Sequence, residues 1–176
     1  MTLLKNGRGN VGDAPIGEAD AFEVLNDINS RYSIDQHRLY LYGTCEGGRR
    51  ALLLAEHYPG LFAAVGVYGP TLALYVRSQG GGHEDVFALT DNLSSTPVIL
   101  VKGEYDDSPP TAALEAFCEK LRKSGSELQI DIIPDGMHKQ KKLEQRIFPF
   151  LIEHRNARSA LSIADQYREA ISRAYP

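Results

Sequence analysis

Cysteine is scarce in this chain. Its two cysteines, Cys45 and Cys118, are too few for a disulfide framework or a cysteine-rich metal site. Cys118 lies in an amphipathic helical pattern, which indicates a small core residue. We expect neither a bound metal nor a cofactor.

Long apolar runs and positive charge are scarce as well. No window holds the roughly 18 apolar residues that a membrane-spanning helix requires, and the opening residues 1–5 are too short for a secretory signal. A cytoplasmic location is therefore the default expectation if the chain is complete. The net charge of -4 argues against binding to nucleic-acid phosphates, and we interpret the basic run 139–142 as the solvated start of a helix. We expect neither nucleic acid nor a membrane as a partner.

What is present is an alternation of strand-like and helix-like segments. Apolar runs of strand length occupy residues 38–42, 63–68, 96–102 and 128–133. Helical patterns occupy residues 18–31, 46–57, 110–124, 139–154 and 157–175, with a short one at 84–91. This alternation predicts an α/β fold with a mostly parallel sheet flanked by helices. We assign residues 1–155 to the main domain and residues 156–176 to a C-terminal helical extension.

Two glycine-rich segments have competing interpretations. Residues 7–12 match the pattern G-x-G-x-x-G, but the helical pattern begins near Gly17 rather than at the third glycine, where a pyrophosphate would meet a helix N-terminus. A surface loop is the better interpretation, with a nucleotide site as the alternative. His83 follows three glycines in a second loop and has no acidic or cysteine neighbour at ligand spacing, so polar surface is its better interpretation.

The segment 43–48 carries the strongest chemical signal. Its sequence, Gly-Thr-Cys-Glu-Gly-Gly, lies between a predicted strand and a predicted helix and matches the G-x-nucleophile-x-G turn, with Cys45 as the nucleophile. We predict that Gly43, Gly47 and Gly48 are small because larger side chains would clash at this sharp turn. A thiol at a helix N-terminus, beside an imidazolium, is expected to ionise readily.

A candidate acid and a candidate base follow two later strands. Asp106 follows the strand 96–102 and His138 follows the strand 128–133, so nucleophile, acid and base occur in the order Cys45, Asp106, His138. The carboxyl ends of parallel strands are where α/β sheets place their ligands. His138 would take the proton of Cys45 and return it to the leaving group, and Asp106 would hold the imidazole in the required tautomer.

Several alternatives remain open at this point. Glu104 and Asp107 are rivals of Asp106 for the acid role, and His138 could instead cap a helix that begins at Lys139. The backbone N–H of Glu46 is the candidate oxyanion donor. The Glu46 carboxylate would disfavour a thiolate unless it points away or pairs with Arg49 or Arg50.

These residues also carry a family resemblance. The segments involved are 7–10, 17–20, 31–35, 38–48, the loop Gly103-x-x-Asp106, and Pro134-Asp135-Gly136-x-His138. In combination they resemble the α/β-hydrolase superfamily, with prolyl-oligopeptidase-type peptidases and related esterases as the nearest branch, over about residues 3–155. Most of that branch has serine where Cys45 stands, and cysteine there resembles the dienelactone-hydrolase branch.

The resemblance implies a hydrolase of small ester, thioester or peptide substrates that acts through Cys45, Asp106 and His138. It also implies earlier strands, one of which would pair with residues 38–42 and carry the loop with the second oxyanion donor. We therefore expect a partial α/β-hydrolase fold that lacks its first strands. Its unpaired sheet edge would be open to self-association or to a missing N-terminal segment. The alternative is a catalytically impaired hydrolase-like module that acts as a structural or interaction protein.

Overall fold

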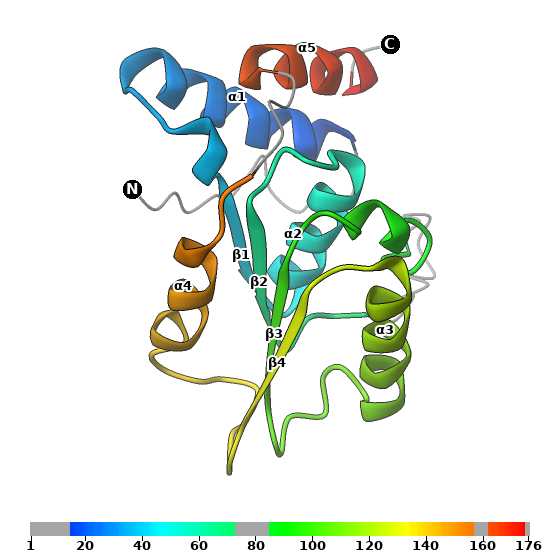
Figure 1. Cartoon of the computed structure of the whole chain (residues 1–176). Coiled ribbons are helices and arrows are strands. Elements are labelled where there is room, and N and C mark those ends of the chain that lie inside the picture. The colour runs from blue at the N-terminus through cyan, green and yellow to red at the C-terminus, as the bar shows by residue number, and fades with distance from the viewer. Residues whose placement is uncertain (1–14, 73–84, 157–161, 175–176) are drawn as a thin grey trace. The chain divides into compact units, whose positions relative to one another are not determined.

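Among the described residues, a parallel four-stranded sheet forms the centre of the larger of two compact units (Figure 1). The computed structural model describes residues 15–72, 85–156 and 162–174. The strands lie side by side in the chain order β1 (Tyr40–Thr44), β2 (Ala64–Tyr68), β3 (Val98–Gly103) and β4 (Leu128–Ile133). This is a parallel sheet, as the alternating sequence pattern predicted.

Burial differs from strand to strand. Every residue of β2 and β3 is buried, as expected for parallel strands that are covered on both faces. β4 lies at one edge of the sheet, and Ile130 and Ile132 share a face on which they are 37% and 47% exposed. Among the described residues β1 pairs only with β2. That a further segment or a second chain pairs with β1 stays a prediction.

Helices cover both faces of the sheet (Figure 1). α4 (Glu144–Glu153) packs against β2 and β3 on one face, while α2 (Glu46–His57) and α3 (Thr111–Ser124) lie on the other. Gly66 of β2 lets α4 approach, because a Cβ at that position would run into the side chain of Ile147. The buried cluster between this helix and the sheet comprises Ala64, Tyr68, Ile99, Val101, Leu143, Ile147, Phe150 and Leu151.

Two further helices form a separate unit of the described structure. α1 (Pro15–Arg31) and α5 (Ile163–Ala174) pack against each other, and both contribute buried apolar side chains such as Phe22 and Ile163. The predicted helices 18–31 and 157–175 correspond to them, with residues 157–161 outside the described part. No helix among the described residues is long and apolar enough to cross a membrane.

Most predicted boundaries agree with the structure. The range 128–133 for β4 is confirmed, and so is the end of α3 at Gly125, which has the left-handed φ of 88° typical of a helix C-terminus. β1 begins two residues later than predicted because Gln36–Arg38 form the 3₁₀ turn η1. The two glycine-rich segments, 7–12 and 80–83 with His83, lie outside the described residues.

Two predicted helices were wrong in extent. α4 begins at Glu144 rather than at 139, because Lys139, Lys141 and Lys142 are exposed and Lys142 has a left-handed φ of 62°. Charged side chains with nothing to pack against do not hold a helical turn on the sheet, so the helix starts where Leu143 becomes buried. In the segment 84–91, the described residues form turns followed by the 3₁₀ helix η2 (Thr90–Leu93). The side chain of Asp85 accepts the N–H of Phe87 at 2.9 Å, which favours a turn over a helix.

Candidate active site

Cys45 lies at a sharp turn between β1 and α2. Its backbone has φ 52° and ψ -122°, a conformation that a residue with a side chain adopts only when its surroundings enforce it. The enforcing contacts are hydrogen bonds of the Cys45 backbone. Its N–H donates to the carbonyl of Tyr68 at 2.9 Å, and its own carbonyl accepts the N–H groups of Gly48 and Arg49 at 3.0 and 3.2 Å. The turn is therefore fixed both to the neighbouring strand and to the helix that follows.

The glycines of this turn have different reasons to be small. A Cβ on Gly43 would collide with the backbone of Gly47, and one on Gly48 would lie 3.1 Å from the Cβ of Pro70. The predicted steric role is confirmed for these two. It was wrong for Gly47, which is exposed and has open space around the position of a Cβ. The crowding lies between the end of β1, the start of α2 and Pro70, and a Cβ on Gly47 would lie outside it.

Asp106 is buried in the loop after β3, and its side chain is only 1% exposed. Oδ1 accepts the N–H of Ser108 at 2.8 Å, and the backbone N–H of Asp106 donates to the carbonyl of Gly103 at 3.1 Å. The backbone carbonyl of Asp106 accepts a hydrogen bond from the ammonium of Lys102, which is itself buried. The loop is thus held by its own backbone and by a side chain from the strand below it.

The two rivals for the acid role, Glu104 and Asp107, are both exposed, whereas Asp106 is buried. The carboxylate of Glu104 accepts the backbone N–H of Asp135 at 3.0 Å, so it braces the loop that leads to His138. Of the three acids in this segment, Asp106 is the one in contact with the histidine.

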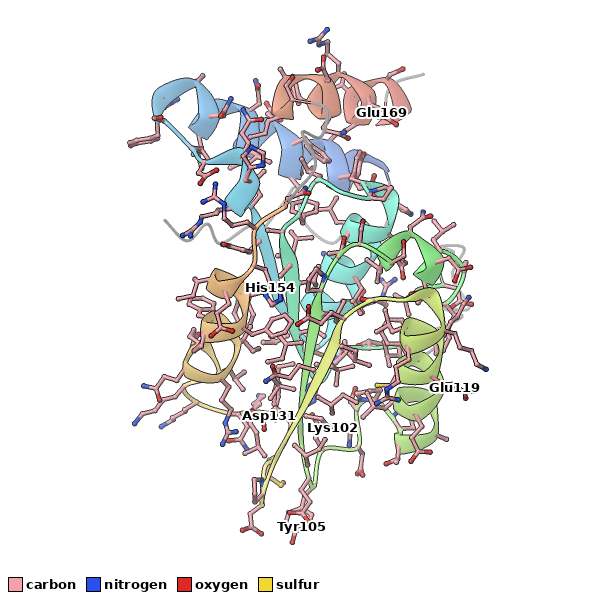
Figure 2. All side chains as sticks on the ribbon, in the orientation of Figure 1. Lys102, Tyr105, Glu119, Asp131, His154 and Glu169 are labelled. Atoms are coloured by element: carbon pink, nitrogen blue, oxygen red, sulfur yellow. The ribbon has the colours of Figure 1, made fainter. Side chains whose placement is uncertain are left out.

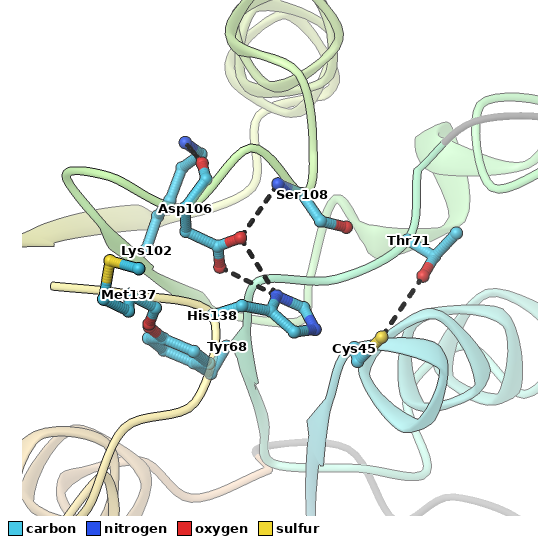
Figure 3. Close-up of polar contacts among 8 residues, drawn as sticks. All are labelled: Cys45, Tyr68, Thr71, Lys102, Asp106, Ser108, Met137 and His138. Atoms are coloured by element: carbon cyan, nitrogen blue, oxygen red, sulfur yellow. Dashed lines mark hydrogen bonds and ion pairs between the residues drawn. The ribbon is translucent and has the colours of Figure 1, made fainter.

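His138 lies opposite Asp106, on the loop after β4. Its Nδ1 is 3.0 Å from Oδ1 and 3.1 Å from Oδ2 of Asp106, and its side chain is 39% exposed. Figure 3 shows the other ring nitrogen pointing toward Cys45. Because α4 begins only at Glu144, His138 is not a helix cap. The structure therefore brings Cys45, Asp106 and His138 to the carboxyl ends of β1, β3 and β4.

The charge of Glu46, next to Cys45, is directed toward arginines. Its carboxylate accepts hydrogen bonds from Arg49, including Nε at 3.1 and 3.2 Å, and Nε of Arg50 lies 3.8 Å from it. This is the pairing that the sequence had suggested as the way to reconcile a carboxylate with a nearby thiolate. Glu46 is also the first residue of α2, so its N–H has no carbonyl one turn earlier to bind.

Three neighbours of the site were missed by sequence reasoning. Thr71 has its hydroxyl oxygen 3.8 Å from Sγ of Cys45, the hydroxyl of Tyr68 donates to the carbonyl of Met137, and Lys102 holds the Asp106 loop. Tyr68 and Lys102 lie in apolar strand runs and were interpreted only as strand residues. A usable signal was their position, since all three lie at or just beyond the carboxyl end of a strand. Tyr105 and Met137, in the same loops, are exposed, and Tyr105 points outward (Figure 2).

The described residues hold no group of three or more histidine, cysteine, aspartate or glutamate side chains placed to bind a metal ion. Both cysteines are free. The chemistry available at this site is that of a thiol, an imidazole and a buried carboxylate.

Known proteins with similar structures include peptidases and esterases. A dipeptidyl peptidase 4 from Porphyromonas gingivalis has a TM-score of 0.65 at 19% identity, covering 80% of this chain and 23% of that one. A "Putative Dienelactone Hydrolase" from Klebsiella pneumoniae has a TM-score of 0.60 at 20% identity, covering 93% of this chain and 60% of that one. These similarities show the α/β-hydrolase fold, which confirms the fold that the sequence motifs indicated.

The sequence comparison is more specific. A "Putative carboxymethylenebutenolidase" from Escherichia coli O157:H7 is 35% identical over 122 residues, which are 66% of this chain and 44% of that protein. The chain thus spans less than half the length of the curated relatives that it matches. Residues 14–163 match the family described as "Dienelactone hydrolase family". Because this match covers most of the chain, including the turn at Cys45, the Asp106 loop and the His138 loop, the chain belongs to the dienelactone hydrolase family.

Proposed function

We propose that this chain carries the active site of an ester hydrolase that works by acyl transfer, with Cys45 as nucleophile, His138 as base and Asp106 as the residue that orients the base. The observation behind this proposal is the buried Asp106–His138 pair, whose free ring nitrogen points toward the strained Cys45 turn. The family name supports it, since a dienelactone is a cyclic ester.

In the first half of the reaction the sulfur attacks the ester. Nε2 of His138 takes the proton of the Cys45 thiol, and the thiolate forms a C–S bond to the carbonyl carbon while the carbonyl electrons move to oxygen. The tetrahedral intermediate then expels the alkoxide, which receives the proton from His138. The products of this half are a free alcohol and an acyl group joined to Cys45 as a thioester.

In the second half, water replaces the alcohol. His138 removes a proton from water, the resulting hydroxide attacks the thioester carbon, and collapse of the intermediate breaks the C–S bond. Cys45 regains its proton from His138, and a carboxylic acid leaves. Asp106 stabilises the imidazolium that forms in both halves by accepting the Nδ1–H hydrogen bond.

The negative oxygen of both intermediates needs donors. The N–H of Glu46 is one candidate, because it is at the N-terminus of α2, where the aligned backbone dipoles favour negative charge. The Glu46 carboxylate would repel a negative oxygen, and its pairing with Arg49 reduces that repulsion.

Esters and thioesters fit this site better than peptides. Their alkoxide or thiolate leaving groups are far weaker bases than the amide anion that a peptide would release, so an amine must be protonated before it can leave. His138 is 39% exposed, so it competes with water for that proton transfer. We therefore expect p-nitrophenyl acetate to be turned over and the matching p-nitroanilide to be a much poorer substrate.

The test combines turnover with thiol reactivity. Cys45→Ala should abolish p-nitrophenyl acetate hydrolysis, and His138→Ala should lower kcat by about 10²- to 10⁴-fold. Cys118→Ala is the matched control and should keep wild-type turnover, because Cys118 is buried in α3. In the folded protein iodoacetamide should modify Cys45 faster than Cys118, whose pKa is raised by burial.

Two results would count against the proposal in different ways. Turnover that survives Cys45→Ala would reject Cys45 as the nucleophile. A folded wild-type protein whose Cys45 reacts faster than Cys118 but that hydrolyses no ester would favour the catalytically impaired module.

A further inference from the structure

The carboxyl end of β2 lies between the strands that carry the nucleophile and the acid. Tyr68, its last residue, is 1% exposed, and its two oxygen atoms bind two different loops. The backbone carbonyl accepts the N–H of Cys45 at 2.9 Å. The phenolic hydroxyl donates to the backbone carbonyl of Met137, the residue directly before His138 (Figure 3). One residue thus contacts both the turn of the nucleophile and the loop of the base.

The next residue extends this contact to the acid. The N–H of Gly69 donates to the carbonyl of Val101 at 2.9 Å, which fixes the segment to β3. A Cβ on Gly69 would lie 2.7 Å from Oδ2 of Asp106 and 3.5 Å from Nδ1 of His138. The backbone of Tyr68 is therefore hydrogen-bonded to Cys45, and the backbone of Gly69 lies close to the side chains of Asp106 and His138.

We propose that Tyr68 is a positioning residue, which sets the separation of Cys45 and His138 by holding the turn through its carbonyl and the base loop through its hydroxyl. This inference rests on the proposed function, because it assigns a residue that aligns the same site.

The hydroxyl is the important part of this arrangement. The side chain of Met137 is 58% exposed, so packing of that side chain does little to hold the loop. The carbonyl of Gly136 accepts the N–H of Tyr105 at 2.8 Å, but this bond ties the base loop to the acid loop and not to the turn of the nucleophile. Among the described contacts, the Tyr68 side chain makes the bond from β2 to the residue that precedes the base.

The environment also keeps Tyr68 in its donating form. Burial raises the pKa of Tyr68, and the nearby negative charge of Asp106 raises the pKa further, against a smaller lowering by a backbone hydrogen bond with Gly103. The hydroxyl therefore remains protonated throughout the pH range in which an imidazole base operates.

Tyr68→Phe removes only the hydroxyl, and Tyr40→Phe is its matched control. Tyr40 lies at the opposite end of β1 from Cys45, and its hydroxyl donates to the backbone carbonyl of His154 at 2.9 Å, so both variants lose one tyrosine-to-carbonyl hydrogen bond. We expect Tyr68→Phe to lower kcat for p-nitrophenyl acetate by roughly 10- to 100-fold, the loss typical of a catalytic group displaced by about 1 Å. KM should change little, and Tyr40→Phe should remain within about twofold of the wild type, since its hydroxyl lies at the end of β1 away from Cys45 and touches no candidate catalytic residue in the contacts described.

The rate of Cys45 alkylation separates positioning from a general loss of structure. With His138 aligned to accept its proton, Cys45 should react with iodoacetamide faster than free cysteine does in the same buffer. In Tyr68→Phe this rate should fall toward that of free cysteine, whereas in Tyr40→Phe it should stay as in the wild type. Met137→Ala should behave as the wild type, because the bond to Tyr68 uses the backbone carbonyl. Urea unfolding of all four proteins shows how much folded protein each assay contains.

The outcomes separate the inference from the function on which it rests. If Tyr68→Phe and Tyr40→Phe have the same kcat and the same rate of Cys45 alkylation, Tyr68 has no positioning role, while Cys45-dependent turnover still supports the proposed function. If the wild type shows no Cys45-dependent turnover, the proposed function fails and the inference fails with it.

Discussion

Gly69→Ala tests how closely the site depends on the backbone of β2. Gly69 has a left-handed φ of 46°, and a Cβ there would lie 2.7 Å from Oδ2 of Asp106 and 3.0 Å from the carbonyl oxygen of Ser108. Gly125, at the end of α3, is a matched control, because its φ is 88° and a Cβ there meets nothing within 4 Å. Both substitutions place alanine in a left-handed conformation, but only one places it against the acid.

Backbone strain alone costs a similar amount of stability at the two positions. A left-handed backbone costs an alanine about 1–2 kcal/mol relative to glycine. Gly125→Ala should therefore lower the free energy of unfolding by about that amount and leave turnover unchanged, since the strain lies far from the site. Gly69→Ala carries the same strain and, in addition, must relieve the contact with Asp106.

That relief displaces the acid. To restore an ordinary contact of 3.4 Å, the carboxylate oxygen has to retreat by about 0.7 Å. The movement disturbs the 2.8 Å hydrogen bond that Oδ1 accepts from the N–H of Ser108 and the contacts of 3.0 and 3.1 Å between the carboxylate and Nδ1 of His138. If the backbone of Gly69 moves instead, it displaces the neighbouring carbonyl of Tyr68, which accepts a hydrogen bond from the N–H of Cys45. Either route misaligns the site, and we expect kcat to fall roughly 10- to 100-fold.

The assay compares initial rates of p-nitrophenyl acetate hydrolysis with urea unfolding curves measured in the same buffer. Rates are expressed per folded molecule, so that a loss of stability does not count as a loss of catalysis. Turnover by Gly69→Ala equal to that of Gly125→Ala would refute the reasoning, because the close approach to Asp106 would then have no bearing on the acid.

Two further predictions concern the core. Gly66→Ala should lower the free energy of unfolding by about 1–3 kcal/mol, as overpacking does in a filled core. The new methyl group would meet Ile147 and push α4 from the sheet. An unchanged urea midpoint would contradict that packing. Burial raises the pKa of Cys118 above its ordinary value of 9.0, so above that pH the unfolded chain releases a proton that the folded chain keeps, and stability falls as pH rises. In Cys118→Ala this contribution to the loss of stability at alkaline pH should be absent, which urea unfolding curves at pH 8 to 10 would show. If stability falls equally with pH in both proteins, Cys118 does not contribute.

The local features of the fold could be predicted because their causes are local. The end of α3 at Gly125 and the range of β4 follow from a glycine and from strand-length patterning. The turn at Cys45 follows from small residues between an apolar strand and a helix, although Gly47 shows that composition does not say which glycine is crowded. The predicted start of α4 at residue 139 was wrong because a helical pattern does not show which side chains have a surface to pack against. The side chains of Lys139, Lys141 and Lys142 have none.

The sequence by itself determined which residues can do chemistry here and the order in which they occur: Cys45, Asp106 and His138, each just after a strand. Only the tertiary structure decided that Asp106, and not Glu104 or Asp107, meets the histidine, because that choice depends on which way a loop turns. It also decided the part played by Tyr68, which lies in a buried strand with no special sequence pattern. Parallel pairing of β1, β2 and β3 aligns strand ends that are distant in the chain, and the contacts made there are a property of register and not of composition.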